Sequence, residues 1–206
     1  MGLPSGALDG LAQTILNLTV PGVADFYQGK EFWDQSLVDP DNRRPVDFAA
    51  RTDALARATP LPELLRGWRD GRVKQAVIAR LLRLRWRCPD LFARGRYQKL
   101  TLEGPRAAHL IAFMRELHGR QLVTIIPRLP YRLLGDGDGL MMPPGTWRET
   151  LVCLPGSRTE IALHDVLSDA VHRLVRLPFL LGGCCAVSDG GAHPSRWNRR
   201  GLKVMR

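Results

Sequence analysis

The spacing of apolar and polar residues divides the chain into a helical first part and a strand-rich second part. Apolar residues recur every three or four positions between Leu8 and Leu18 and again between Leu64 and Arg87, which predicts two amphipathic helices. The Ala- and Arg-rich stretch Val46–Ala58 is also predicted to be helical. Pro89 disfavours helical geometry in the residue before it, so the long helix is expected to end there.

A short apolar stretch between two turn signals follows the first helix. Pro21-Gly22 stops that helix, Val23–Tyr27 is predicted to form a short buried strand, and Gln28-Gly29 closes the strand. The following segment, Glu31–Pro45, is predicted to be a loop because it has no apolar periodicity.

After Gly95 the apolar residues form short β-rich runs separated by turns. The predicted strands are Tyr97–Leu102, Leu110–Met114, Leu122–Ile126, Trp147–Leu154 and Ile161–Val166. The connection Arg115–Gly119 joins the second and third of them and is typical of a hairpin. The acidic stretch Gly135–Gly139 lacks the spacing of a calcium-binding EF-hand loop and is interpreted as a surface turn. The fold class is therefore α+β, with a boundary near residue 95.

The composition is typical of a globular protein, and the basic residues are concentrated in the segment that contains the long predicted helix. The chain has 206 residues, 45% hydrophobic residues and a formal charge of +10, which is enough apolar material for a core. Residues 61–100 carry 11 basic and 3 acidic groups, a net charge of +8. These arginines form either a solvated helix face or, alternatively, a basic module that binds nucleic-acid phosphates. That set is Arg66, Arg69, Arg72, Arg80, Arg83 and Arg87. Arg85 would lie in the apolar arc, where it either pairs with a carboxylate or extends to solvent.

Several classes of site and location find no support in the sequence. The cysteines Cys88, Cys153, Cys184 and Cys185 form no C-x-x-C pair, and no His or Cys stands at zinc-finger spacing. No secretory signal opens the chain, and the longest apolar run, Leu177–Ala186, is too short to span a bilayer. The expectation is a cytoplasmic protein with free thiols, no cofactor and no membrane contact.

Residues 21–47 concentrate polar groups that Gly and Pro hold in place. Asp25, Gln28 and Asn42 offer the paired donors and acceptors that suit sugar hydroxyls, and Tyr27 or Trp33 could cover an apolar sugar face. The equally weighted alternative is a structural ion-pair network that holds the loop, formed by Asp25, Asp41, Arg43 and Arg44. The carboxylates all lie in one loop region, which argues against a self-contained catalytic pair for glycoside chemistry.

Specific motifs in this stretch carry a family resemblance. Asp25-Phe26-Tyr27-Gln28-Gly29, the run from Asp39 to Asp47 (Asp-Pro-Asp-Asn-Arg-Arg-Pro-Val-Asp) and Trp68-Arg69-Asp70-Gly71-Arg72 resemble the C-terminal part of malto-oligosyltrehalose synthase. That enzyme is a member of the α-amylase family of barrel glycosidases. The similarity extends over roughly residues 8–187, and the run from Asp39 to Asp47 is its most specific part.

The resemblance implies a division of the chain. Residues 1–95 would be the last helix-strand-helix portion of a TIM barrel, with Val23–Tyr27 as its last strand. Residues 96–187 would be a small antiparallel β-sandwich domain. Residues 188–206 depart from the family pattern, and their Gly-, Ser-, Arg- and Asn-rich composition with little periodicity predicts a disordered tail.

The resemblance also implies an activity. The family converts the reducing-end α-1,4 bond of a malto-oligosaccharide into an α,α-1,1 trehalose bond, an isomerase reaction in trehalose biosynthesis. The family's catalytic carboxylates come from earlier barrel strands without counterpart here, so the chain alone is expected to be inactive, or to complement a separate upstream polypeptide. The substrate-binding residues that it implies are Asp25, Tyr27, Gln28, Glu31, Asp41, Asn42, Arg43 and Arg44.

Overall fold

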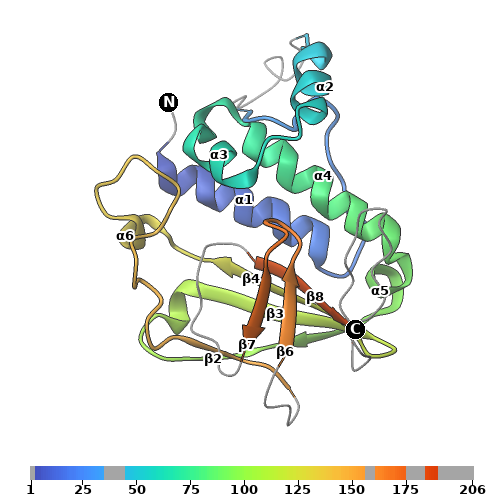
Figure 1. Ribbon diagram of the computed structural model, residues 1–206, viewed down its shortest axis with the longest axis vertical. Coiled ribbons are helices and arrows are strands. Elements are labelled where there is room, and N and C mark those ends of the chain that lie inside the picture. The colour runs from blue at the N-terminus through green and yellow to red at the C-terminus, as the bar shows by residue number, and fades with distance from the viewer. Residues whose placement is uncertain (1–2, 35–44, 156–160, 175–183, 190–206) are drawn as a thin grey trace.

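A computed structural model describes residues 3–34, 45–155, 161–174 and 184–189. The helices, which come mostly first along the chain, are α1 (Pro4–Thr19), α2 (Phe48–Ala56), α3 (Leu61–Arg66), α4 (Arg72–Arg87), α5 (Pro89–Arg94) and α6 (Tyr131–Leu134). The strands are β1 (Arg96–Lys99), β2 (Thr101–Glu103), β3 (Leu110–Leu117), β4 (Arg120–Pro127), β5 (Leu151–Cys153), β6 (Ile161–Asp165), β7 (Val171–Leu174) and β8 (Cys184–Asp189). Figure 1 shows α1–α4 gathered on one side of the strands, with α6 apart from them.

The long predicted helix is interrupted near its start. Instead of one helix over Leu64–Arg87, the chain forms α3, a 3-10 turn over Trp68–Asp70 and then α4. Gly71 separates the last two with a φ of +80°, a left-handed conformation that glycine adopts without steric cost. A side chain there would also collide with the neighbouring loop, because an added Cβ would lie 2.5 Å from the backbone nitrogen of Trp33.

The strands form two antiparallel sheets. The larger has the order β1-β3-β4-β8-β6-β7, and the smaller pairs β2 with β5. The predicted hairpin is confirmed as β3 and β4, which pair from Leu110↔Pro127 to Leu117↔Arg120 around a turn at His118-Gly119. Strand β8 was not predicted, because its place is set by pairing with β4 and β6 and not by a local pattern.

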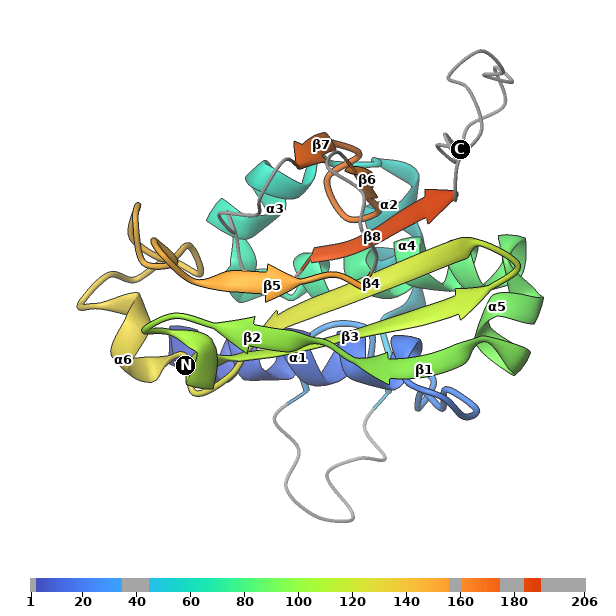
Figure 2. The same ribbon diagram turned by 90° about the horizontal axis from the view of Figure 1, so that it is seen from below.

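Strand β4 takes part in two clusters of buried apolar side chains. Leu122 and Ile126 belong to the cluster that contains the apolar faces of α1 and α4, whereas Val123 and Ile125 belong to the cluster that contains Trp147 and Val152. This alternation follows from the two-residue period of a strand. Figure 2 shows β2 and β5 beside the larger sheet, away from α4. The mixture of helices with small antiparallel sheets confirms the coarse fold class, and the barrel-remnant, sandwich and domain boundaries stay predictions.

Two expectations for the first part are wrong. Val23–Tyr27 pairs with no strand among the described residues, and Val23 is 94% exposed, because an extended segment becomes a strand only where a neighbour accepts its hydrogen bonds. Arg85 pairs with no carboxylate of the described residues, and it is not extended freely to solvent. Its guanidinium donates to the carbonyl oxygens of Leu18 (2.8 Å) and Gly22 (3.4 Å) and lies over the ring of Phe92.

Some predictions concern residues outside the described ranges. These are the Asp39–Arg44 loop, residues 190–206 of the predicted tail, and most of the apolar run Leu177–Ala186. Cys88 and Cys153 form no disulfide within the part of the chain that the structure describes. Among the described helices, none has the length and apolar character needed to cross a membrane.

Candidate functional site

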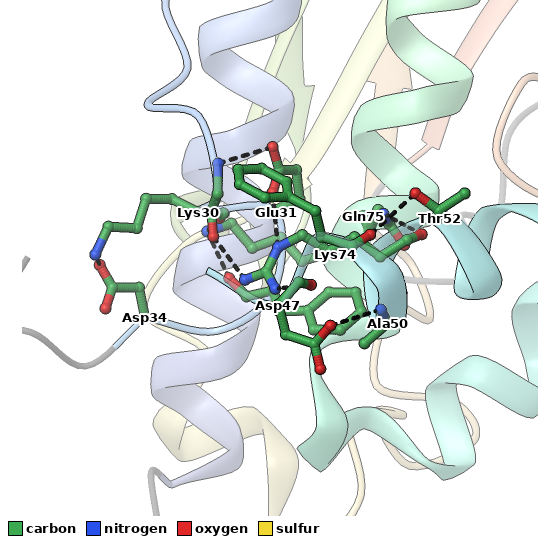
Figure 3. A network of polar contacts seen from close by, with 12 residues as sticks. Lys30, Glu31, Asp34, Asp47, Ala50, Thr52, Lys74 and Gln75 are labelled. Carbon is green, nitrogen blue, oxygen red and sulfur yellow. Dashed lines mark hydrogen bonds and ion pairs between the residues drawn. The ribbon is translucent and has the colours of Figure 1, made fainter. Parts of the chain in front are cut away.

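The loop at residues 28–34 is held by Arg51, which lies in α2. The Arg51 guanidinium donates from Nε to Glu31 Oε2 at 2.9 Å, from Nη2 to the Gly29 carbonyl oxygen at 2.6 Å, and from Nη1 to the Asp47 carbonyl oxygen at 2.9 Å. Its planar fork of donors can satisfy all three acceptors at once, which an ammonium group could not do with the same geometry. Figure 3 shows the side chains converging between α2 and α4. Arg51 therefore fixes the path of the loop.

Glu31 is half-buried and fully engaged in this network. Its second carboxylate oxygen, Oε1, accepts a hydrogen bond of 3.1 Å from the Gly29 backbone N–H. Burial acts to raise the pKa of Glu31, but backbone hydrogen bonds and the Arg51 guanidinium together outweigh it and lower that pKa below its ordinary value. Glu31 is thus an ionised brace of the loop, with both oxygens already occupied.

Lys74 in α4 holds the next part of the same loop. Its ammonium donates to the carbonyl oxygens of Lys30 (2.8 Å) and Phe32 (3.3 Å). Partial burial lowers the pKa of Lys74, although the nearby carboxylates of Asp34 and Glu31 act in the opposite direction. The loop is consequently tied to α2 and to α4 by two different cations.

The helices that carry these cations are themselves linked. The Asp47 side chain caps α2 by accepting a hydrogen bond of 2.9 Å from the Ala50 N–H. Gln75, buried in α4, donates from Nε2 to the Arg51 carbonyl oxygen at 3.0 Å. The network therefore rests on two anchored helices (Figure 3).

The structure separates the predicted sugar-binding residues. Asp25, Tyr27 and Gln28 have exposed side chains, and Tyr27 is 72% exposed. Glu31 lies in the Arg51 network, so it is held differently from the other three. Asp41, Asn42, Arg43 and Arg44 lie outside the described residues, and three of them belong to the alternative ion-pair network, which therefore stays a prediction. Asp25, its described member, contributes a carbonyl oxygen that accepts from Asn17 Nδ2 at 2.8 Å.

An aromatic cleft of about 880 Å³ lies between α1 and the loop. Phe26, Trp33 and Trp68 line it together with polar groups that include Gln13 and Lys74. Trp33 Nε1 donates to the Trp68 carbonyl oxygen at 2.6 Å, and the two rings meet edge to face with centroids 6.5 Å apart. Phe26 lines this cleft whereas its neighbours Asp25 and Tyr27 do not, as the alternation of an extended segment requires.

Sequence reasoning missed Arg51, Lys74 and Trp68 as parts of this site. Arg51 lies 20 residues from Glu31, and Lys74 lies 44 residues from Lys30. Trp68 stands in the motif Trp68–Arg72, which could have indicated it, whereas no local signal distinguishes Arg51 and Lys74 from other helical residues. The described residues contain no group of three or more His, Cys, Asp or Glu side chains arranged to hold a metal ion.

Two of the arginines proposed for nucleic-acid phosphates already have acidic partners. Arg69 pairs with Asp138 and also lies over the Trp68 ring, and Arg72 pairs with Asp70 at 2.7 Å. Both pairs are at the surface, so they are weak. They nevertheless reduce the positive charge of this face, which argues against the basic-module alternative.

Comparison with known proteins points to one kind of enzyme. No family model matches the chain. It is 42% identical over 146 residues, 69% of its length, to the putative maltooligosyl trehalose synthase of Mycobacterium tuberculosis. The structure of maltooligosyltrehalose synthase from Arthrobacter ramosus matches 88% of the chain with 38% identity and a TM-score of 0.61. The chain spans only 17% and 22% of those two proteins.

A more distant likeness extends to the α-amylases. A noncanonic maltogenic alpha-amylase, AmyB from Thermotoga neapolitana, matches 86% of the chain with a TM-score of 0.55. Its sequence identity is 12%, so this is a likeness of fold.

Proposed function

Because this chain is homologous to a part of maltooligosyl trehalose synthase, we propose that it forms one wall of a malto-oligosaccharide cleft in a trehalose-forming enzyme of the α-amylase family. The observation that carries the proposal is the set of exposed side chains Asp25, Tyr27 and Gln28, the sugar-binding row, which leads into the loop held by Arg51 and Lys74. Exposed polar groups on a fixed backbone can bind a sugar without first losing conformational freedom.

The role of this wall is to bind sugar and not to break bonds. Glycoside chemistry needs two carboxyl groups on either side of one bond, roughly 5–10 Å apart. Glu31 accepts hydrogen bonds from Arg51 and Gly29 on its two oxygens, and its lowered pKa disfavours it as a general acid, so we assign it to holding the loop. Asp34, the other described carboxylate of the loop, forms an ion pair with Lys30. We therefore propose that the chain alone does not convert an α-1,4 bond into an α,α-1,1 bond.

The test is to incubate the purified protein with maltopentaose and to follow the reducing end. We expect the reducing sugar to persist, since no product with a trehalose end forms. Appearance of a non-reducing product with a trehalose end would overturn the proposal of a silent chain. Binding is measured separately, by the retardation of the protein in a native gel that contains amylose. We expect amylose to retard the protein in the gel and maltopentaose to remain unconverted.

A second candidate is a subunit of a split trehalose-forming enzyme. The observation in its favour is the extended segment Val23–Tyr27, whose exposed edge could accept a strand from another polypeptide. Co-expression with a polypeptide that holds the preceding part of a homologous synthase should give a co-purifying pair that consumes maltopentaose. Failure to co-purify, or a pair without activity, would count against it.

The remaining proposals concern partners and location. Cys88 and Cys153 form no disulfide among the described residues, which agrees with a reducing, cytoplasmic location. Nucleic acid is the least favoured partner, because Arg69 and Arg72 are paired with Asp138 and Asp70. A band shift with DNA or RNA that weakens steeply with salt would revive that alternative.

A further inference from the structure

A second, apolar pocket lies away from the sugar-binding row. It has a volume of about 550 Å³ and opens where α1, α3 and α4 meet the loop at residues 138–142 and the turn at residues 165–168. Figure 1 shows α3 near the end of the helical layer at which α1 begins. Its walls are aliphatic: the residues that the argument uses are Leu8, Leu11, Ile15, Leu65, Val77 and Met142. None of Asp25, Tyr27, Gln28 and Glu31 lines it.

The chemistry of these walls selects an apolar occupant. An apolar cavity does not hold water well, because water molecules inside it would lack hydrogen-bond partners. Sugars would meet the same difficulty, since the aliphatic walls cannot satisfy their hydroxyl groups. The volume falls within the range of small-molecule sites, which commonly bury most of a ligand. Met141 and Met142 at the pocket add flexible thioether side chains that adapt to an irregular ligand.

The charged groups of the pocket are not equivalent. Asp138 is paired with Arg69, and the Asp165 carboxylate accepts hydrogen bonds from the Leu167 N–H (2.9 Å) and the Ser168 hydroxyl. Arg66 lines the pocket, is exposed, and has no ion-pair or hydrogen-bond partner among the described residues. Among the described residues that line the pocket, the charge left to meet a ligand is therefore a guanidinium, which binds carboxylates through paired donors.

We propose that this pocket binds an aliphatic carboxylate, with the hydrocarbon chain between α1, α3 and α4 and the carboxylate on Arg66. A chain on the order of twelve carbons suits a pocket of this size. The site is independent of the proposed sugar wall, so either proposal can fail without the other.

The test is displacement of a dansyl-labelled fatty acid by dodecanoate, below the critical micelle concentration and with the whole chain. We expect dodecanoate to displace the probe and to raise the melting temperature, because a ligand of the folded state stabilises that state. Dodecanol should compete about tenfold less well, which is the loss expected for one charge-assisted hydrogen bond. Dodecyltrimethylammonium, which has the same chain and the opposite charge, should compete least.

Three variants test whether the ligand binds in this pocket. Arg66→Gln should reduce the affinity for dodecanoate to that for dodecanol and leave the affinity for dodecanol unchanged. Arg94→Gln is the matched control, because Arg94 is another exposed arginine and lies outside the pocket. Leu65→Trp, which fills the pocket from its wall, should abolish binding of both ligands, with circular dichroism confirming the fold.

Two results would overturn the proposal. One is the absence of saturable displacement by dodecanoate. The other is an affinity for dodecanoate that is the same in Arg66→Gln, Arg94→Gln and the unchanged protein, since that would mean non-specific binding to apolar surface.

Discussion

The guanidinium of Arg115, in β3, donates a hydrogen bond of 2.8 Å to the carbonyl oxygen of Phe92, in α5. It also donates to the carbonyl oxygens of Gly95 at 3.1 Å and Thr19 at 3.4 Å. Only 1% of Arg115 is exposed, and burial lowers the pKa of its guanidinium. A single side chain of the sheet thus satisfies the backbone at the ends of α1 and α5.

Replacing Arg115 by Met should lower the free energy of unfolding by about 3 kcal/mol or more, because three carbonyl oxygens would lose a charged donor. Arg115→Lys should recover only part of the loss, since an ammonium group cannot reach all three acceptors in the same geometry. Urea denaturation measures both changes. Arg96→Met is the control: its pair with Glu116 is at the surface, so the change should be below about 1 kcal/mol. Equal losses in the two Met variants would contradict this role for Arg115.

Glu31→Gln should remove a pH-dependent part of the stability. The pKa of Glu31 is lowered in the folded protein, so its ionised form stabilises the fold above the pKa of the unfolded chain. That contribution is lost as the pH falls through the lower, folded-state pKa. The exposed part of the side chain limits the effect to about 1 kcal/mol at neutral pH. Thermal unfolding measured from pH 7 down to pH 3 should show the melting temperatures of Glu31→Gln and the unchanged protein converging in acid. A difference in melting temperature that stays constant with pH would contradict the prediction.

Gly71→Ala should destabilise the fold by about 1–3 kcal/mol. Gly71 has a φ of +80°, and an added Cβ would lie 2.5 Å from the Trp33 backbone nitrogen. Gly6→Ala is the matched control, because Gly6 lies in α1 and an added Cβ there meets nothing within 4 Å. That change should stabilise by about 0.5–1 kcal/mol, since alanine favours helix. Melting temperatures of Gly71→Ala and Gly6→Ala that change in the same direction would contradict this prediction.

Tyr27→Ala should weaken retardation in amylose-containing gels about tenfold without lowering the melting temperature, because an aromatic ring covers the apolar face of a sugar. Tyr131→Ala is the control, since Tyr131 is equally exposed at 72% but lies outside the sugar-binding row. Both variants should unfold within about 0.5 kcal/mol of the unchanged protein. Equal gel mobility of the two variants would show that Tyr27 has no part in binding.

Sequence periodicity predicted those parts of the fold that depend on neighbouring residues. The apolar face of α1 and the β3–β4 hairpin follow from local spacing and a local turn, and both were found. Val23–Tyr27 has the composition of a strand, but its strand character depends on a neighbouring strand that its own residues cannot specify. The helix break at Gly71 likewise depends on the close approach of the loop at Trp33.

The sequence predicted the loop of the candidate site but not the two cations that hold the loop in place. Glu31 is recognisable because it stands in a specific motif with Gln28 and Gly29. Arg51 and Lys74 are ordinary cations of ordinary helices, and only the fold brings them to the carbonyl oxygens of Gly29 and Lys30. Sequence patterns report local conformation well, whereas they carry little information on which distant cation will meet a given carbonyl oxygen.

Strand β4, which contributes to both apolar clusters, bears on the order of events during folding. It joins β3 through a tight turn, so this pair forms with little loss of chain entropy and presents Leu122 to one cluster and Val123 to the other. We expect the hairpin to act as the folding nucleus, with φ-values of about 0.5 or more for Leu122→Ala and Val123→Ala. Leu91→Ala in α5 should give a φ-value near zero, because that short helix would dock only after the sheet has formed.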